Sequence, residues 1–449
     1  MSLITLITFV LIGIIGLIVL LIVALKPRWF WPMLCIVTVG TGGLVIQKIS
    51  YVDEYLALCV FLGGILAISI GGVHFQKNKE NKWDQFHKLV FIIMIIYLFV
   101  QCLDSFMYNF TGLESFKKIR WLALYGLLGL LSCIFSLRGF PFPPVRKMSL
   151  IIAATALGYF LPYLTIGWFS ENVLKESKLG IFSPNWAGTT YSFFPLVVII
   201  PALIFLIKDK SRLYRRIGWI TLLIVTFTSF YYVSRISWLV LFGFLITAFP
   251  LLGLRKVIQY SIIFLLLLII FTEFIWPKWF TLEVFREDLL NIPKVIWDPS
   301  ATQDMGRFID IKITFPIISS NWQTFFFGHG FQASGPLIGP NLAKLWTKYG
   351  RPDIAAAEED YQSASAFTVL VVEGGFIGLS LLILNFLFVA RKLLFKKEVY
   401  GRGILLFSLS VTFLWLFTGT LLDIVLFYLI IVPSGLLIKL TTSQNQNNI

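Results

Sequence analysis

Residues 4–25 read ITLITFVLIGIIGLIVLLIVAL, and apolar runs of this kind decide the fold that the sequence predicts. A helix of about 20 predominantly apolar residues is long enough to cross the hydrocarbon core of a bilayer. No basic residue precedes this first run, and it is long for the core of a signal peptide, so we expect a retained helix. Comparable runs recur along nearly the whole of the 449 residues.

The composition favours the same prediction. Hydrophobic residues make up 58% of the chain and charged residues only 13%, whereas a soluble domain carries roughly 25% charged residues. We therefore predict an all-α polytopic integral membrane protein with about 12–13 transmembrane helices. The predicted spans are 4–25, 29–46, 55–73, 89–106, 121–137, 150–169, 193–207, 217–232, 236–252, 257–274, 366–389, 404–418 and 421–438.

The net charge of +14 would point to nucleic acid on a soluble protein. Here the basic residues fall in short loops between alternate apolar runs, which is the pattern that orients a membrane protein. We therefore predict no nucleic-acid partner, an outer N-terminus and an inner polar tail. The basic loops predicted to be cytoplasmic are 77–82, 138–147, 208–216, 255–256 and 391–402. One basic loop departs from the pattern, because Lys117, Lys118 and Arg120 fall on the outer side.

One outer segment, residues 275–365, is far longer than the other connections. A structureless loop of that length is improbable in a compact protein, so we expect a mostly helical cap. Three parts follow: residues 1–274 with about ten spans, the cap at 275–365, and residues 366–449 with about three spans and a polar tail. Neither a phosphate-binding glycine loop nor a metal-ligand spacing occurs, so no cofactor and no metal are predicted.

Two arginines are candidates for an anion site. Arg235 lies in YYVSRISW, a short outer turn where a residue that only fixes topology is not expected. It is either an arginine that reaches the interface with its long side chain or a ligand for a phosphate or pyrophosphate. Arg307, in MGRFIDIKITFP, lies in the cap and could clamp the same pyrophosphate.

Five further groups could act as a base. Of the three histidines only His329, in FFFGHGFQASG, is predicted on the outer side, where it is either a base or a turn residue between glycines. Glu359 and Asp360, with Glu358 before them, form an acidic cluster that also suits a solvated helix start. Glu373 follows inside the next apolar run, as a structural partner or as a general base.

Four segments together resemble the O-antigen ligase and Wzy-type polymerase superfamily of bacterial envelope enzymes. In chain order they are GIFSPNWAGTTYSFFPL (180–196), VSRISWLVLFGF (233–244), GRFIDIKITFPIISSNWQTFFFGHGF (306–331) and FTVLVVEGGFIGL (367–379). The resemblance extends over about residues 180–379. The matching positions it assigns to substrate binding are Asn185, Ser234, Gly328, Gly330 and Glu373.

The resemblance implies an enzyme of the bacterial inner membrane with a periplasmic active face. It would transfer or polymerise a glycan from undecaprenyl diphosphate to the hydroxyl of a glycan or lipid acceptor, without a metal, and polymerisation is preferred over ligation. Its partners would be the donor, the acceptor, the lipid bilayer and other polysaccharide assembly proteins. Arg235 and Arg307 would stabilise the charge that develops on the leaving diphosphate.

One departure concerns the base. The family carries a His-Asn pair nine residues before the glutamate matched to Glu373, and Ala364 and Ser365 stand there instead. Asp360, Glu359 or His329 would have to replace the missing histidine. Two other classes stay open: a non-catalytic relative that binds lipid-linked glycan for assembly or export, and a transporter or flippase of lipid-linked sugars.

Overall fold

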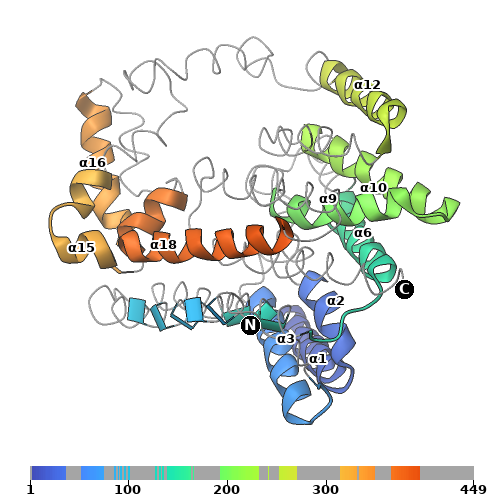
Figure 1. Ribbon diagram of the computed structural model, residues 1–449, viewed down its shortest axis with the longest axis horizontal. Helices are drawn as coiled ribbons and strands as arrows, with labels where there is room; N and C mark the ends of the chain where they lie inside the picture. The colour runs from blue at the N-terminus through green and yellow to red at the C-terminus, as the bar shows by residue number, and fades with distance from the viewer. Residues whose placement is uncertain are drawn as a thin grey trace.

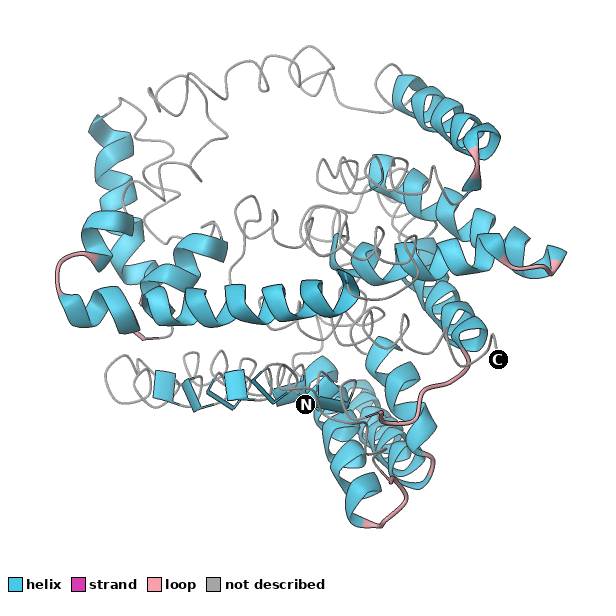
Figure 2. Cartoon of the chain, viewed as in Figure 1, coloured by secondary structure: helices cyan, strands magenta, loops and turns pink. Residues whose placement is uncertain are grey.

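The computed structural model describes eight main ranges, and in these no residue lies in a β-strand (Figure 2). They are 3–36, 52–74, 139–162, 193–231, 252–270, 314–330, 333–348 and 366–394, with short pieces between 85 and 135 and the single residues 165 and 241. Helix dominates these ranges, as the apolar runs predicted.

The prediction of a membrane-spanning fold is wrong. Among the described helices, none combines the length and the apolar character needed to cross a membrane. The polytopic architecture, the transmembrane helices and the place in a bacterial inner membrane with a periplasmic active face are corrected accordingly. Helix α9 (Phe193–Lys208) has only 16 residues, where about 20 are needed. Helix α18 (Ala366–Leu394) is interrupted at Gly375.

The first helices pack closely because small residues face their partners. Helix α1 (Leu3–Leu25) lies against α3 (Val52–Ser69). A Cβ at Gly63 would lie 2.8 Å from the Cβ of Val23, so only glycine permits this approach. The hydroxyl of Tyr55 donates to the carbonyl of Gly13 at 3.0 Å and joins the same two helices.

An aromatic cluster connects this pair to the next group. The 3₁₀ turn η1 (Pro27–Trp29) leads into α2 (Phe30–Cys35). Pro27 suits the first position of η1 because the backbone N–H that proline lacks has no helical partner there. Phe30 is fully buried and lies 4.9 Å from Phe135 and 5.3 Å from Phe140, ring centre to ring centre. These edge-on contacts are the arrangement that aromatic rings prefer.

Helices α6 (Val145–Pro162), α9 and α10 (Arg212–Tyr231) form the most closely packed group. Their shared core includes Ala153, Leu203 and Ile207, all fully buried. Asp209 makes the tight turn between α9 and α10, where its side chain accepts a hydrogen bond from the amide of Ser211 at 2.8 Å. Aspartate often closes turns in this way.

Helix α12 (Leu254–Ile270) attaches to α10 through a small number of contacts. The hydroxyls of Tyr260 and Thr226 are hydrogen bonded in a buried position. The rings of Phe230 and Phe264 meet edge-on, with their centres 4.8 Å apart.

In Figure 1, α15 (Trp322–Phe327) and α16 (Ser334–Lys348) lie at the left, and α18 runs from them toward the middle of the molecule. Helices α15 and α16 both contact α18. The described pieces of 85–101 run antiparallel to α18, since Phe86 meets Phe388 and Tyr97 meets Gly374. Both short helices fall inside the predicted cap, and the predicted division into three parts stays a prediction.

Candidate functional site

A glycine turn ends helix α15. Asn321 caps the start of this helix by accepting a hydrogen bond from the amide of Gln323 at 3.2 Å. Gly328 and Gly330 follow with φ of +76° and +83°, a backbone region that residues with a Cβ rarely adopt. Residues 328–330, here named the Gly-His-Gly turn, therefore hold His329 between two left-handed positions.

The Gly-His-Gly turn is hydrogen bonded to α18 at the kink. The amide of His329 donates to the carbonyl of Val372 at 2.8 Å, and the amide of Gly330 donates to the carbonyl of Glu373 at 3.1 Å. Gly375, with φ of +59°, interrupts the helix just after these two residues. Because an interrupted helix leaves carbonyls without partners along its axis, the kink provides acceptors for the turn.

The two segments are too close for side chains at the contact. A Cβ at Gly328 would lie 2.7 Å from the amide nitrogen of Gly375 and closer still to the carbonyl of Glu373. A Cβ at Gly375 would in turn lie 2.5 Å from the amide nitrogen of Gly328. Beside this contact the rings of Phe325 and Phe376 stack with their centres 4.4 Å apart. The turn and the kink therefore form one unit.

Tyr97 and Gln101 support this unit from a third segment, and the sequence analysis did not find them. The hydroxyl of Tyr97 bonds to the carbonyl of Gly374 and lies 3.2 Å from the carbonyl of Phe327. The side-chain amide of Gln101 donates to the same Phe327 carbonyl at 2.6 Å. The sequence pattern that could have revealed them is a pair of polar residues four positions apart inside an apolar run. This spacing places both side chains on one face of a helix.

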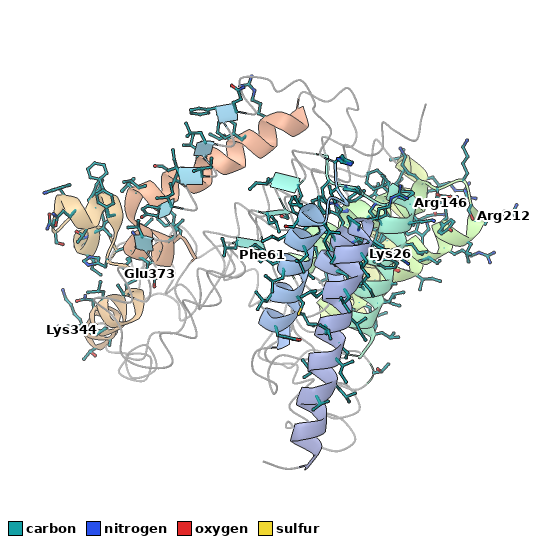
Figure 3. All side chains as sticks on the ribbon, turned by 90° about the horizontal axis from the view of Figure 1, so that it is seen from below. Lys26, Phe61, Arg146, Arg212, Lys344 and Glu373 are labelled. Carbon is teal, nitrogen blue, oxygen red and sulfur yellow. The ribbon has the colours of Figure 1, made fainter. Side chains whose placement is uncertain are left out.

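Glu373 is buried, with 5% of its surface exposed. It lies at the end of α18 that meets α16 (Figure 3). Burying a carboxylate is costly unless it is paired or hydrogen bonded, so this position asks for either a structural or a chemical role. Its backbone carbonyl already has a structural role, because it accepts the hydrogen bond from Gly330.

The structure brings together four of the predicted site residues. Gly328, His329, Gly330 and Glu373 meet at the contact between the turn and the kink. His329 is partly buried there. The other predicted site residues lie outside the described residues, so the arginine clamp and the acidic bases stay predictions: Arg235, Arg307, Glu359, Asp360, Asn185 and Ser234.

Within the described part of the chain, no group of three or more histidine, cysteine, aspartate or glutamate side chains could hold a metal ion. What the arrangement offers instead is a histidine and a glutamate held on a rigid backbone. Their backbone positions are set by main-chain hydrogen bonds and by the side chains of Tyr97 and Gln101, and a functional group needs support of this kind.

No protein family matches this chain, and no curated protein matches it either. The resemblance to the ligase and polymerase superfamily therefore rests on the four sequence segments alone.

Proposed function

We propose that this chain transfers or polymerises a glycan carried on undecaprenyl diphosphate, without a metal, and that polymerisation is preferred over ligation. One observation supports the proposal. The third and fourth segments of the resemblance, which are separate in the sequence, meet at the Gly-His-Gly turn and are joined by hydrogen bonds from His329 and Gly330. Parts that act in one site have to lie together in this way.

In the proposed reaction an acceptor hydroxyl oxygen forms a bond to the anomeric carbon of the donor. The bond from that carbon to the diphosphate oxygen breaks, and the diphosphate leaves with the electron pair. Arg235 and Arg307 are proposed to stabilise its negative charge, with their planar guanidinium groups matching two phosphate oxygens at once. Asn185, Ser234, Gly328, Gly330 and Glu373 are proposed to bind substrate.

The proton of the acceptor hydroxyl has to pass to a base. His329 is one proposed base, and it lies among the residues that the structure describes. Its amide is hydrogen bonded to the carbonyl of Val372. Asp360 and Glu359 are the other proposed bases, since Ala364 stands where the family has its histidine. Base assistance contributes about 10²–10⁴-fold to such reactions.

The arginines are tested on the purified full chain supplied with a glycan on undecaprenyl diphosphate. Release of undecaprenyl diphosphate and the length of the glycan product are measured. We expect Arg235→Ala and Arg307→Ala each to lower the rate by about 10²–10³-fold. Arg28→Ala is the matched control, because Arg28 is exposed and lies in η1, away from the turn. Unchanged rates in both variants would overturn the assignment.

The base is identified with a second set of variants. His329→Ala is compared with His74→Ala, which removes an exposed histidine from the end of the α3 segment, and with Asp360→Asn and Glu359→Gln. The true base is the residue whose loss lowers the rate by about 10²–10⁴-fold and flattens one limb of the pH profile. His74→Ala should leave both unchanged.

A second function is favoured by one observation, the alanine at position 364. A non-catalytic relative would bind the lipid-linked glycan and release no diphosphate. Donor binding by the unmodified chain, without turnover under any acceptor condition, would select this function over the enzyme.

A further inference from the structure

Seven basic side chains gather where α6 and α10 begin and α9 ends. We name this surface the basic face: Arg146, Lys147, Lys208, Lys210, Arg212, Arg215 and Arg216. All are exposed except Arg215, which is partly buried. The sequence analysis explained these residues as signals for orientation in a membrane. The structure places them on one surface, and a surface with this charge can bind an anion.

The fold brings these cations to one edge of the molecule. Each of the three helices packs against the other two. Arg146 bridges them directly, because its Nε lies 3.0 Å from an oxygen of Asp209 and its guanidinium lies 3.9 Å from the ring centre of Tyr214. Figure 3 shows Arg146 and Arg212 at the same edge of this helix group.

Asp209 is the one acidic residue in α6, α9, α10 and the turn between the last two. One of its oxygens accepts from Arg146 and the other from the amide of Ser211 at 2.8 Å. The negative charge of Asp209 is therefore balanced by Arg146 and stabilised by the amide of Ser211. Within these three helices and the turn, seven basic residues therefore accompany a single carboxylate, and both oxygens of that carboxylate have partners.

The helix ends add to the positive potential. Arg146 and Lys147 lie in the first turn of α6 and Arg212 in the first turn of α10, and neither first turn holds an acidic residue. The start of a helix carries partial positive charge, so cations are unfavourable there and an anion is favourable. Lys208 alone has the favourable position, at the end of α9. An anion bound at this edge would relieve the repulsion.

We infer that the basic face binds the phosphate groups of a diphosphate or a longer polyphosphate anion. Arginine forks and lysine ammonium groups are the side chains that bind phosphate oxygens, and cations on three helices suit several linked phosphates. Nucleic-acid bases usually stack on aromatic rings, and the ring of Tyr214 beside the basic face already has the guanidinium of Arg146 over it. The inference does not depend on the proposed function, because the basic face lies away from the Gly-His-Gly turn.

The test measures binding of inorganic tripolyphosphate and polyphosphate to the full chain. Arg212→Glu/Arg216→Glu reverses two exposed charges four residues apart on α10. Lys344→Glu/Lys348→Glu is the matched control, with the same charge change and spacing on two exposed residues of α16. We expect the first variant to bind about ten-fold or more weakly, and to lower the slope of log affinity against log salt by roughly 1 to 2. The control should bind as the unmodified chain does.

Three further arms decide the source of the phosphate. Vesicles with anionic phospholipid, compared with zwitterionic vesicles, show whether lipid headgroups supply it, and a single-stranded oligonucleotide tests nucleic acid. Equal polyphosphate affinity in both charge-reversal variants, or tighter binding of the oligonucleotide than of polyphosphate, would overturn the inference. If Arg212→Glu/Arg216→Glu does not fold, Lys147→Gln/Lys210→Gln takes its place, with the same expected direction.

Discussion

Two regions of this molecule hold their helices together by different means. In the α6, α9 and α10 group, buried side chains such as Leu203 and Ile207 fill the space between the helices. At the Gly-His-Gly turn the contact runs between backbone atoms, with Gly328 against Glu373 and Gly375. A side-chain core can adjust to a change by repacking, whereas a backbone contact has no side chain that can move away.

The largest effect is expected when a methyl group is added at the backbone contact. Gly328→Ala would place a Cβ against Glu373 and Gly375 at a φ of +76°, so steric overlap and backbone strain add to about 4 kcal/mol of lost stability. Denaturant-induced unfolding measures the loss. Gly253→Ala is the control, because Gly253 has a φ of +80° with nothing within 4 Å of its Cβ position. It should lose only about 1 kcal/mol, and equal losses would mean that strain alone matters.

A smaller loss is expected from a cavity in the packed group. Leu203→Ala removes a fully buried side chain of α9 and should cost about 3 kcal/mol through lost burial and an unfilled cavity. Leu213→Ala in α10 serves as the control because Leu213 is 63% exposed, and it should change stability by less than about 0.5 kcal/mol. Similar losses in the two variants would contradict the buried core described here.

Tyr260 gives the contact between α12 and α10 a dependence on pH. Burial raises the pKa of its phenol, and the hydrogen bond with Thr226 lowers it by less. A raised folded-state pKa means that stability is intact below the ordinary tyrosine pKa of about 10 and falls as the pH rises above it. Tyr260→Phe should cost about 1 kcal/mol at neutral pH and should make this alkaline fall less steep. Thermal unfolding from pH 8 to 11 checks both effects, and an unchanged alkaline slope would count against the burial of this phenol.

The burial of Cys35 raises the pKa of its thiol and adds to the same alkaline fall. Because Cys35 is present in both the unmodified chain and Tyr260→Phe, the difference between the two curves isolates the tyrosine.

The smallest effect is expected at the surface ion pair. Asp209→Asn removes the charge that pairs with Arg146, whose side chain is 50% exposed, so the loss should be about 0.5 kcal/mol and should shrink in high salt. Asparagine keeps an oxygen that can accept from Ser211. Unfolding at low and high salt provides the measurement, and a loss above about 2 kcal/mol would place the ion pair in the core of the group.

Helix positions were largely predictable from the apolar runs. The run at 193–207 and helix α9 nearly coincide, and the runs at 217–232 and 257–274 overlap α10 and α12. The runs predicted helices because each is about long enough to cross a bilayer as a helix. Their assignment as membrane spans was wrong, because a count of apolar residues does not show where a helix begins, ends or kinks. Gly375 interrupts one predicted span in its middle.

The candidate site was predictable in part. Gly328 and Gly330 were singled out by the resemblance, His329 as the one histidine predicted on the outer side, and Glu373 as a carboxylate inside an apolar run. The structure places all four at one contact. The contact itself was not predictable, since hydrogen bonds between distant main-chain atoms leave no periodic pattern in a sequence. Tyr97 escaped notice for a related reason, because its role depends on the carbonyl of Gly374, a group that every residue has.

The contact between Gly328 and Gly375 has a genetic consequence. A Cβ on either glycine would meet the other's main-chain nitrogen, so no change of amino acid at one position can make room for a side chain at the other. Compensating pairs, which are common between interlocking side chains, should be absent here. A screen for second-site suppressors of Gly328→Ala should yield true revertants and general stabilisers scattered over the protein, and none at position 375.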